Sequence, residues 1–155
     1  MPEISVRTLE RQPTLVMWGK VVVKDMPQFL GRAFRAAATH AETLGTEICG
    51  PPFARYRPLD SEFKEFEVEA GFPVTNEPTG SEEVDASSLP AGPAAVAMHI
   101  GPYDAMVPAY DAIVAFLREQ HAEAFGPAWE VYLSDASEEP DPAKWRTEIV
   151  QPFMA

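Results

Sequence analysis

The sequence predicts an α+β fold in which a unit of one strand, one helix and two further strands occurs twice in tandem. Short segments in which apolar and polar residues alternate are typical of strands, and two longer segments with apolar residues every three or four positions are typical of helices. The same spacing of 79 residues separates Asp25 from Asp104 and Glu69 from Glu148. With 155 residues, 46% of them hydrophobic, the chain is expected to form a single domain over residues 1–155.

The first half begins with two segments of strand character. Residues alternate from Ile4 to Leu9, and a second strand is expected from Leu15 to about Val23. A polar turn that ends at Pro13 separates them, so the pattern predicts a hairpin.

A helix follows, with Asp25 as its capping residue and Pro27 in its first turn. Its apolar residues recur at helical spacing until Gly45 ends it: Phe29, Leu30, Ala33, Phe34, Ala37, Ala41 and Leu44. Two strands are predicted next, from Phe53 to Arg57 and from Glu65 to Val74. The polar residues from Asn76 to about Asp85 are expected to form a connector.

The second half repeats this order. A strand is predicted from Ala94 to Ile100, and Asp104 is expected to cap a second helix whose apolar face holds Met106, Tyr110, Ile113, Val114 and Leu117. A strand from Trp129 to Asp135, an acidic loop up to Asp141 and a closing strand from Trp145 to Pro152 complete the half.

The spacing of 79 residues also relates Phe66 to Trp145 and Pro73 to Pro152, which predicts an internal duplication with pseudo-repeats of about 1–75 and 84–155. Tyr56 matches Tyr132 if the two halves differ by three residues. Two such units can join their antiparallel sheets about a pseudo-twofold axis, with the two helices around a central cleft. Pockets favour the interface between packed units, so this cleft is the expected ligand site.

Glu130 is the leading candidate for a functional residue. Alternation along its strand places Trp129, Val131 and Leu133 on one face, while Glu130 and Tyr132 share the other. Burial of a carboxylate is unfavourable unless a partner or ligand satisfies it. The alternative is that Glu130 points to water from a half-exposed strand.

Aromatic residues could line the cleft around this carboxylate. Aromatic faces attract cations, and a carboxylate adds a full charge to the attraction, so the combination favours an apolar organic cation. Taken singly, Phe53, Trp18 and Tyr110 are more often core residues than ligand contacts. The expected ligand-binding residues are Glu130, Tyr132, Trp145, Tyr56, Tyr110 and Phe53, with Trp18 and Phe153 as weaker candidates.

Composition argues against several other kinds of protein. The formal net charge of −12 opposes direct contact with nucleic acid. No apolar segment is long enough for a membrane span, and a cytoplasmic location is expected. The sequence has a single cysteine, Cys49, and widely spaced histidines, so no metal site is expected. It also lacks the glycine-rich loop that binds cofactor phosphates, so no cofactor is expected. His99 is expected to be a hydrogen-bonded structural residue rather than a general base.

Three motifs, in this order, resemble the GyrI-like small-molecule-binding domain, which is also the effector-binding domain of multidrug-sensing bacterial regulators. They are Leu89-Pro90-Ala91-Gly92, His99-Ile100-Gly101-Pro102-Tyr103-Asp104 and Glu130-Val131-Tyr132-Leu133-Ser134-Asp135. The resemblance implies a duplicated βαββ fold whose cleft binds lipophilic, often cationic compounds. It also implies that Glu130 lies at the bottom of the pocket, with Trp145, Tyr56 and Tyr110 as its aromatic neighbours.

The resemblance leaves three functions open. The chain carries no helix-turn-helix segment before the domain, so a binding protein without its own DNA-binding part is expected rather than an enzyme. Some members resemble hydrolases of cyclopropane-containing genotoxins, and in that case Glu130 and Tyr132 would be the catalytic residues. Others are gyrase inhibitory proteins, which suggests a protein-interaction module whose acidic loop contacts a protein partner.

Overall fold

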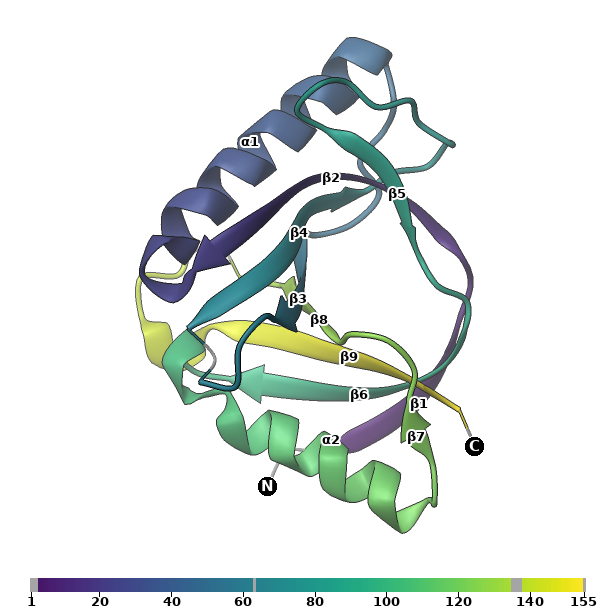
Figure 1. Ribbon diagram of the computed structural model, residues 1–155, viewed down its shortest axis with the longest axis vertical. Helices are drawn as coiled ribbons and strands as arrows, with labels where there is room; N and C mark the ends of the chain where they lie inside the picture. The colour runs from purple at the N-terminus through teal and green to yellow at the C-terminus, as the bar shows by residue number, and fades with distance from the viewer. Residues whose placement is uncertain (1–2, 63, 135–137, 155) are drawn as a thin grey trace. The chain divides into compact units, whose positions relative to one another are not determined.

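The structure, a computed structural model, describes residues 3–62, 64–134 and 138–154. The chain folds into two compact units. Unit 1 consists of residues 1–10 and 91–155, and unit 2 of residues 11–90. Each unit combines an α-helix with antiparallel strands, so the predicted α+β class is confirmed (Figure 1).

Unit 2 is continuous in sequence and forms its strands in the order β3-β4-β2-β5. Its helix packs against β2 and β4, where Leu15, Ala37 and Val74 are among the buried core residues. The elements are β2 (Gln12–Val22), α1 (Met26–Leu44), β3 (Phe53–Pro58), β4 (Glu65–Pro73) and β5 (Asp85–Leu89), with a short 3-10 helix η1 (Val23–Asp25) before α1.

The predicted proline in the first turn of α1 and the predicted end of α1 at Gly45 are confirmed, whereas the predicted capping by Asp25 is wrong. Asp25 occupies the N-cap position, but its ψ of 0° differs from the extended conformation of a typical capping residue, and its side chain accepts no capping hydrogen bond. Gly45 ends the helix with a φ of 70°, a left-handed conformation that glycine adopts without steric penalty. Its N–H donates to the carbonyls of Ala41 and Glu42, which satisfies the end of the helix.

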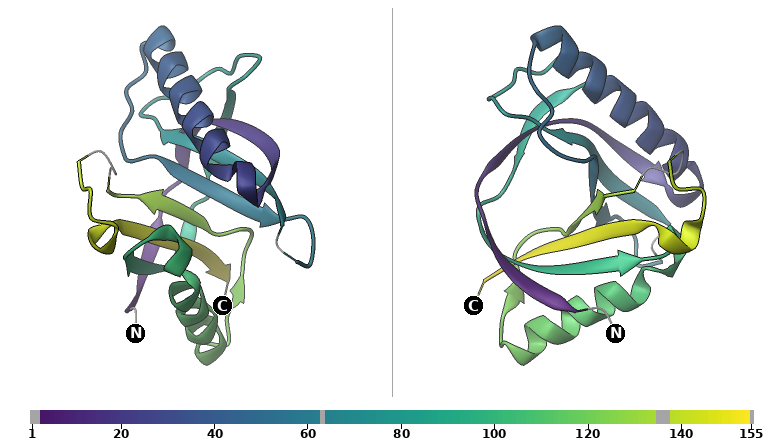
Figure 2. Two further views of the ribbon diagram at one scale, coloured as in Figure 1. Left: turned by 90° about the vertical axis from the view of Figure 1, so that its left-hand side faces the viewer. Right: turned by 180° about the vertical axis from the view of Figure 1, so that it is seen from behind.

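Unit 1 is built from the two ends of the chain, with the strand order β1-β6-β9-β8 and β7 paired to β9. Helix α2 packs against β6 and β9, and the right-hand view of Figure 2 shows it running alongside β6. The elements are β1 (Ile4–Leu9), β6 (Gly92–Ile100), η2 (Tyr103–Ala105), α2 (Val107–Glu119), β7 (Glu123–Ala124), β8 (Trp129–Tyr132), η3 (Pro142–Lys144) and β9 (Arg146–Met154).

The pairing registers of the two units correspond. Tyr56 of β3 lies opposite Val68 of β4, and Tyr132 of β8 lies opposite Thr147 of β9. Val68 and Thr147 are 79 residues apart, whereas Tyr56 and Tyr132 are 76 apart. The shift of three residues expected from the sequence is therefore present in the strand pairing.

The predicted hairpin of the first two strands is wrong. β1 pairs with β6, whereas β2 pairs with β4 and β5. Alternation identifies a strand and its faces, but the backbone groups of that strand can be satisfied by any compatible edge. The chain passes from unit 1 to unit 2 between Glu10 and Arg11, which separates the two expected partners.

Other boundaries also differ from expectation. Asp104 does not cap α2, because it lies in η2 and the helix begins only at Val107. Pro108 fits the first turn of α2, where a missing N–H is tolerated, and this favours the later start. β8 ends at Tyr132, before the predicted end at Asp135, which lies outside the described residues. Strands β5 and β7 were not predicted.

Across the described parts of the chain, no helix combines the length and the apolar character needed to cross a membrane.

Candidate functional site

The carboxylate of Glu130 is buried in unit 1, with 8% of the residue exposed. The Tyr132 hydroxyl donates a hydrogen bond to one carboxylate oxygen at 2.9 Å. The Tyr110 hydroxyl donates a hydrogen bond to the other oxygen. Phenol hydroxyls are good donors to a carboxylate, so the burial of this group is compensated from both sides.

Strand geometry explains how these groups meet. Glu130 and Tyr132 are two residues apart on β8, so they share one face, and their partners Ile149 and Thr147 on β9 share that face with them. Ile149 belongs to the core that α2 forms with β6 and β9, and Tyr110 of α2 packs against this core. The carboxylate therefore lies on the helix-covered face of the sheet in unit 1.

Burial raises the pKa of Glu130 above its ordinary value of 4.5, because the low-dielectric surroundings disfavour the charged form. The hydrogen bonds from Tyr110 and Tyr132 and the nearby His99 act in the opposite direction, but desolvation is the largest effect. A carboxyl group with a raised pKa can exchange a proton closer to neutral pH. In its ionised form, the buried carboxylate is stabilised by a cation that replaces the water lost on burial.

An aromatic cluster lies next to this carboxylate. The ring of Tyr103 packs edge-on against Tyr132 with centroids 5.7 Å apart, and it stacks on Trp145 at 5.0 Å with an angle of 29° between the ring planes. The indole N–H of Trp145 donates to the carbonyl of Glu139 at 2.7 Å. Four predicted site residues thus lie in unit 1, namely Glu130, Tyr132, Tyr110 and Trp145. Tyr103 lies beside two of them and is not among the predicted residues.

Tyr103 lies between the predicted strand end at Ile100 and the predicted helix cap at Asp104. A side chain in such a turn is normally exposed, so the sequence pattern does not identify Tyr103 as a site residue. Only the pairing of β9 with β6 brings this turn beside Trp145, where the Gly101 N–H donates to the Trp145 carbonyl at 2.8 Å. That contact joins residues that are far apart in sequence, so local patterns do not reveal it.

The two remaining ligand-binding candidates belong to unit 2. Phe53 is only 2% exposed and is a core residue on β3. Tyr56 is half-buried, and its ring packs edge-on against Phe66 at 6.0 Å. Of the weaker candidates, Trp18 is 45% exposed and Phe153 packs against the core of unit 1. A ligand-binding role for Tyr56 and Phe53 remains a prediction.

Two further polar side chains lie on the same sheet face as Glu130. His99 of β6 is buried and its Nε2 is 2.8 Å from the carbonyl of Pro102, which confirms the expected structural hydrogen bond. Thr147 lies between His99 and Tyr132 in the strand register and is fully buried. Its hydroxyl has no hydrogen-bond partner among the described residues.

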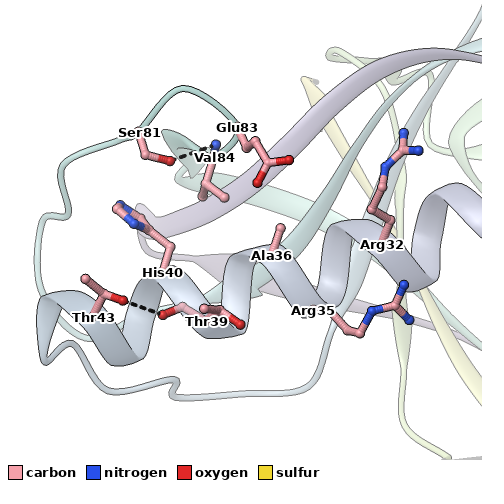
Figure 3. A pocket seen from close by; sticks show the side chains of 9 residues that line it. All are labelled: Arg32, Arg35, Ala36, Thr39, His40, Thr43, Ser81, Glu83 and Val84. Carbon is pink, nitrogen blue, oxygen red and sulfur yellow. Dashed lines mark hydrogen bonds between the residues drawn. The ribbon is translucent and has the colours of Figure 1, made fainter.

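A separate shallow hollow of about 390 Å³ lies in unit 2, between α1 and the segment 81–84 (Figure 3). It is largely polar and has no Phe, Tyr or Trp among its described lining residues. Those residues are Arg32, Arg35, Ala36, Thr39, His40, Thr43, Ser81, Glu83 and Val84. It contains none of the predicted site residues and lacks the aromatic surface that an apolar ligand requires, so Glu130 remains the candidate site.

The part of the chain that the structure describes contains no group of three or more His, Cys, Asp or Glu side chains placed to hold a metal ion. The two units, each with one helix against antiparallel strands, define the class of the protein as an α+β domain. The model of the GyrI-like small molecule binding domain matches residues 3–154. The chain therefore belongs to the GyrI-like family.

Solved structures share this fold. The C-terminal domain of EcmrR has a TM-score of 0.82 at 17% identity, covering 99% of this chain and 98% of that domain. EcmrR in its complex with DNA has a TM-score of 0.85 at 18% identity over 98% of this chain, and the match spans 57% of that longer protein.

Two other solved structures of this fold are a hydrolase and a protein bound to an organic cation. A hydrolase encoded by lin2189 from Listeria innocua has a TM-score of 0.75 at 13% identity, covering 98% of this chain and 92% of that one. SAV2435 bound to tetraphenylphosphonium has a TM-score of 0.68 at 13% identity, covering 99% and 94%. These low identities show the fold alone. A search of curated proteins found no match.

Proposed function

We propose that the protein is a small-molecule-binding protein for lipophilic organic cations and that Glu130 of unit 1 is the anionic centre of its site. The observation that carries the proposal is the buried carboxylate held by the hydroxyls of Tyr110 and Tyr132. Neutral donors hold the carboxylate in place without cancelling its charge. An apolar cation can therefore gain both charge attraction and contact with aromatic rings.

The charge distribution supports this ligand class. Unit 1 contains twelve Asp and Glu residues and four Lys and Arg residues, which gives a formal charge of −8, two thirds of the chain's −12. A negative field attracts cations toward the unit that holds Glu130 and repels anions from it. The tetraphenylphosphonium bound to SAV2435, a protein of the same fold, is a cation of the proposed kind.

The test compares two probes of nearly the same shape, the cation methyltriphenylphosphonium and the neutral triphenylphosphine oxide. Glu130→Gln should weaken binding of the cation at least tenfold, because contacts with a charged group are worth about 1.5–3 kcal/mol, and it should change binding of the oxide much less. Isothermal titration calorimetry measures both affinities.

Glu148→Gln is the matched control, since Glu148 is a carboxylate of the same unit that is already paired with Arg7 at 3.0 Å. It should leave both affinities nearly unchanged. Equal weakening of both probes by Glu130→Gln, or equal effects of the two substitutions, would show that the Glu130 charge does not select the ligand.

A second candidate function is hydrolysis of strained-ring electrophiles, which the raised pKa of Glu130 favours. A carboxyl group of this kind suits general acid or base work, and the Tyr132 hydroxyl is placed to stabilise a developing charge. Incubation with cyclopropane-containing electrophiles, followed by mass spectrometry, distinguishes the two functions. Product that forms with the wild-type protein but not with Glu130→Gln supports hydrolysis, whereas saturable binding without product supports the binding protein.

A further inference from the structure

We propose that the hollow of unit 2 is a second ligand site, which binds a small anion with several phosphate or carboxylate oxygens through Arg32 and Arg35. The hollow lies between α1 and the segment 81–84 (Figure 3). Its volume of about 390 Å³ falls within the range of about 300–1,000 Å³ that is typical of small-molecule sites. The proposal is independent of Glu130, which belongs to unit 1.

One face of α1 supplies most of the lining of this hollow. Its lining residues follow one another at intervals of one, three or four positions, which places them on the same side of a helix. They are Arg32, Arg35, Ala36, Thr39, His40 and Thr43. Between Met26 and Ala41 the helix carries the two arginines and no Asp or Glu, so no acidic neighbour in that stretch offsets their charge.

The two guanidinium groups are available to a ligand. Arg32 and Arg35 are exposed, and neither forms an ion pair or a side-chain hydrogen bond with any residue that the structure describes. The Arg32 guanidinium lies 5.7 Å from the ring centroid of Phe29, a contact that does not neutralise its charge. Guanidinium groups bind phosphate and carboxylate oxygens with two parallel hydrogen bonds, so this pair favours an oxyanion.

The segment opposite α1 is held in place at two points. Val84 is 2% exposed and belongs to the same buried core cluster as Ala37 of α1. Nε2 of His40 lies 2.8 Å from the carbonyl oxygen of Thr79. Within the segment, the Ser81 N–H donates to the Val84 carbonyl at 2.7 Å, and the Ser81 hydroxyl oxygen accepts from the Val84 N–H at 3.2 Å. Both walls of the hollow are therefore held by the protein itself.

The other polar side chains of the hollow decide the sign of the charge that it accepts. Because the Ser81 oxygen is the acceptor in its turn, its O–H proton can be donated to a ligand. Glu83 is the only acidic residue among the described lining residues, and it forms no ion pair with either arginine in the described part of the chain. Two arginines and one glutamate leave a formal charge of +1 at the hollow, in a chain whose net charge is −12. The hollow is thus a local basic site that favours an anion.

The test titrates the isotope-labelled protein with inorganic pyrophosphate and with citrate at constant ionic strength, and follows the amide signals by NMR. Saturable shifts in α1 and in the segment 81–84 are expected with at least one probe, and the tighter probe tells whether phosphate or carboxylate oxygens are preferred. Arg32→Gln and Arg35→Gln should each weaken binding about threefold and together about tenfold, since exposed charge pairs contribute modestly. Glu83→Gln should strengthen binding about twofold, because a repulsive charge is removed.

Arg57→Gln is the matched control, because Arg57 is an exposed arginine of the same unit that does not line the hollow. It should leave the affinity for both probes nearly unchanged. Equal weakening by Arg57→Gln and Arg35→Gln would mean non-specific attraction and would overturn the site, as would weaker binding by Glu83→Gln. Absence of saturable shifts with both probes at millimolar concentration would also overturn it. All four side chains are exposed, so the variants should fold, and an unchanged circular dichroism spectrum verifies this.

Discussion

If Glu130 is the anionic centre that we propose, the charge state of this one side chain should control the binding of cations. Burial raises the pKa of Glu130, so the group stays partly protonated at pH values where an exposed carboxyl is fully ionised. A protonated Glu130 has no charge for a cation to meet. The affinity for cations should therefore depend on pH above the ordinary carboxyl value of 4.5.

Methyltriphenylphosphonium is a suitable probe because its own charge does not titrate. Its affinity should fall toward that of Glu130→Gln as the pH drops below the raised pKa of Glu130, and it should level off above that pKa. Calorimetric titrations across the pH range give the profile. Glu130→Gln should give a flat profile, and a wild-type profile that is equally flat would contradict the role of this carboxylate.

At the scale of secondary-structure elements, the close approach of β2 to β4 depends on Gly71. A Cβ at this position would lie 1.9 Å from the backbone oxygen of Leu15, which is far inside van der Waals contact. Gly71→Ala should therefore lower the free energy of unfolding by about 3 kcal/mol, because the strands must separate to admit the methyl group.

Gly31 on α1 is the matched control. A Cβ there would meet only the end of the Arg35 side chain, at 3.5 Å. Gly31→Ala should raise the free energy of unfolding by about 0.5–1 kcal/mol, since alanine has the higher helix propensity. Denaturant unfolding followed by circular dichroism compares the two variants, and similar stabilities for both would contradict the strand approach at Gly71.

The two kinds of element differ in how far the sequence predicts them. α1 was predicted within a residue or two because its apolar spacing, its early proline and Gly45 are all local signals. The pairing partner of β1 was not predicted, because an alternating strand can pair with any strand edge that satisfies its backbone N–H and C=O groups. The candidate site likewise contains residues that local sequence patterns predict and one residue that they do not. Glu130 and Tyr132 share a face by strand periodicity, whereas Tyr103 reaches them only through the tertiary pairing of β9.

At the scale of the whole molecule, the corresponding registers indicate one cation site per chain. Glu130 lies opposite Ile149, and the residue in the same place of unit 2 is Ala54, which lies opposite Ala70. Unit 2 therefore has the tyrosine of the pair, Tyr56, but an alanine in the position of Glu130. An alanine gives a cation no charge to bind.

Native mass spectrometry should accordingly detect one methyltriphenylphosphonium bound per wild-type chain and almost none bound to Glu130→Gln at the same concentration. Two cations bound with similar affinity would contradict the assignment of the charge to Glu130 alone. One cation retained by Glu130→Gln would do so as well.

The pairing of β1 with β6 sets the order in which the two units can fold during synthesis. All strands of unit 2 lie within residues 11–90, so this unit can form as soon as β5 has emerged from the ribosome. β1 is made first, yet it has no partner until β6 emerges, and β6 in turn needs the last strand, β9. The unit that holds Glu130 is thus completed last, and a chain interrupted after β5 should carry a formed unit 2 without the proposed binding site.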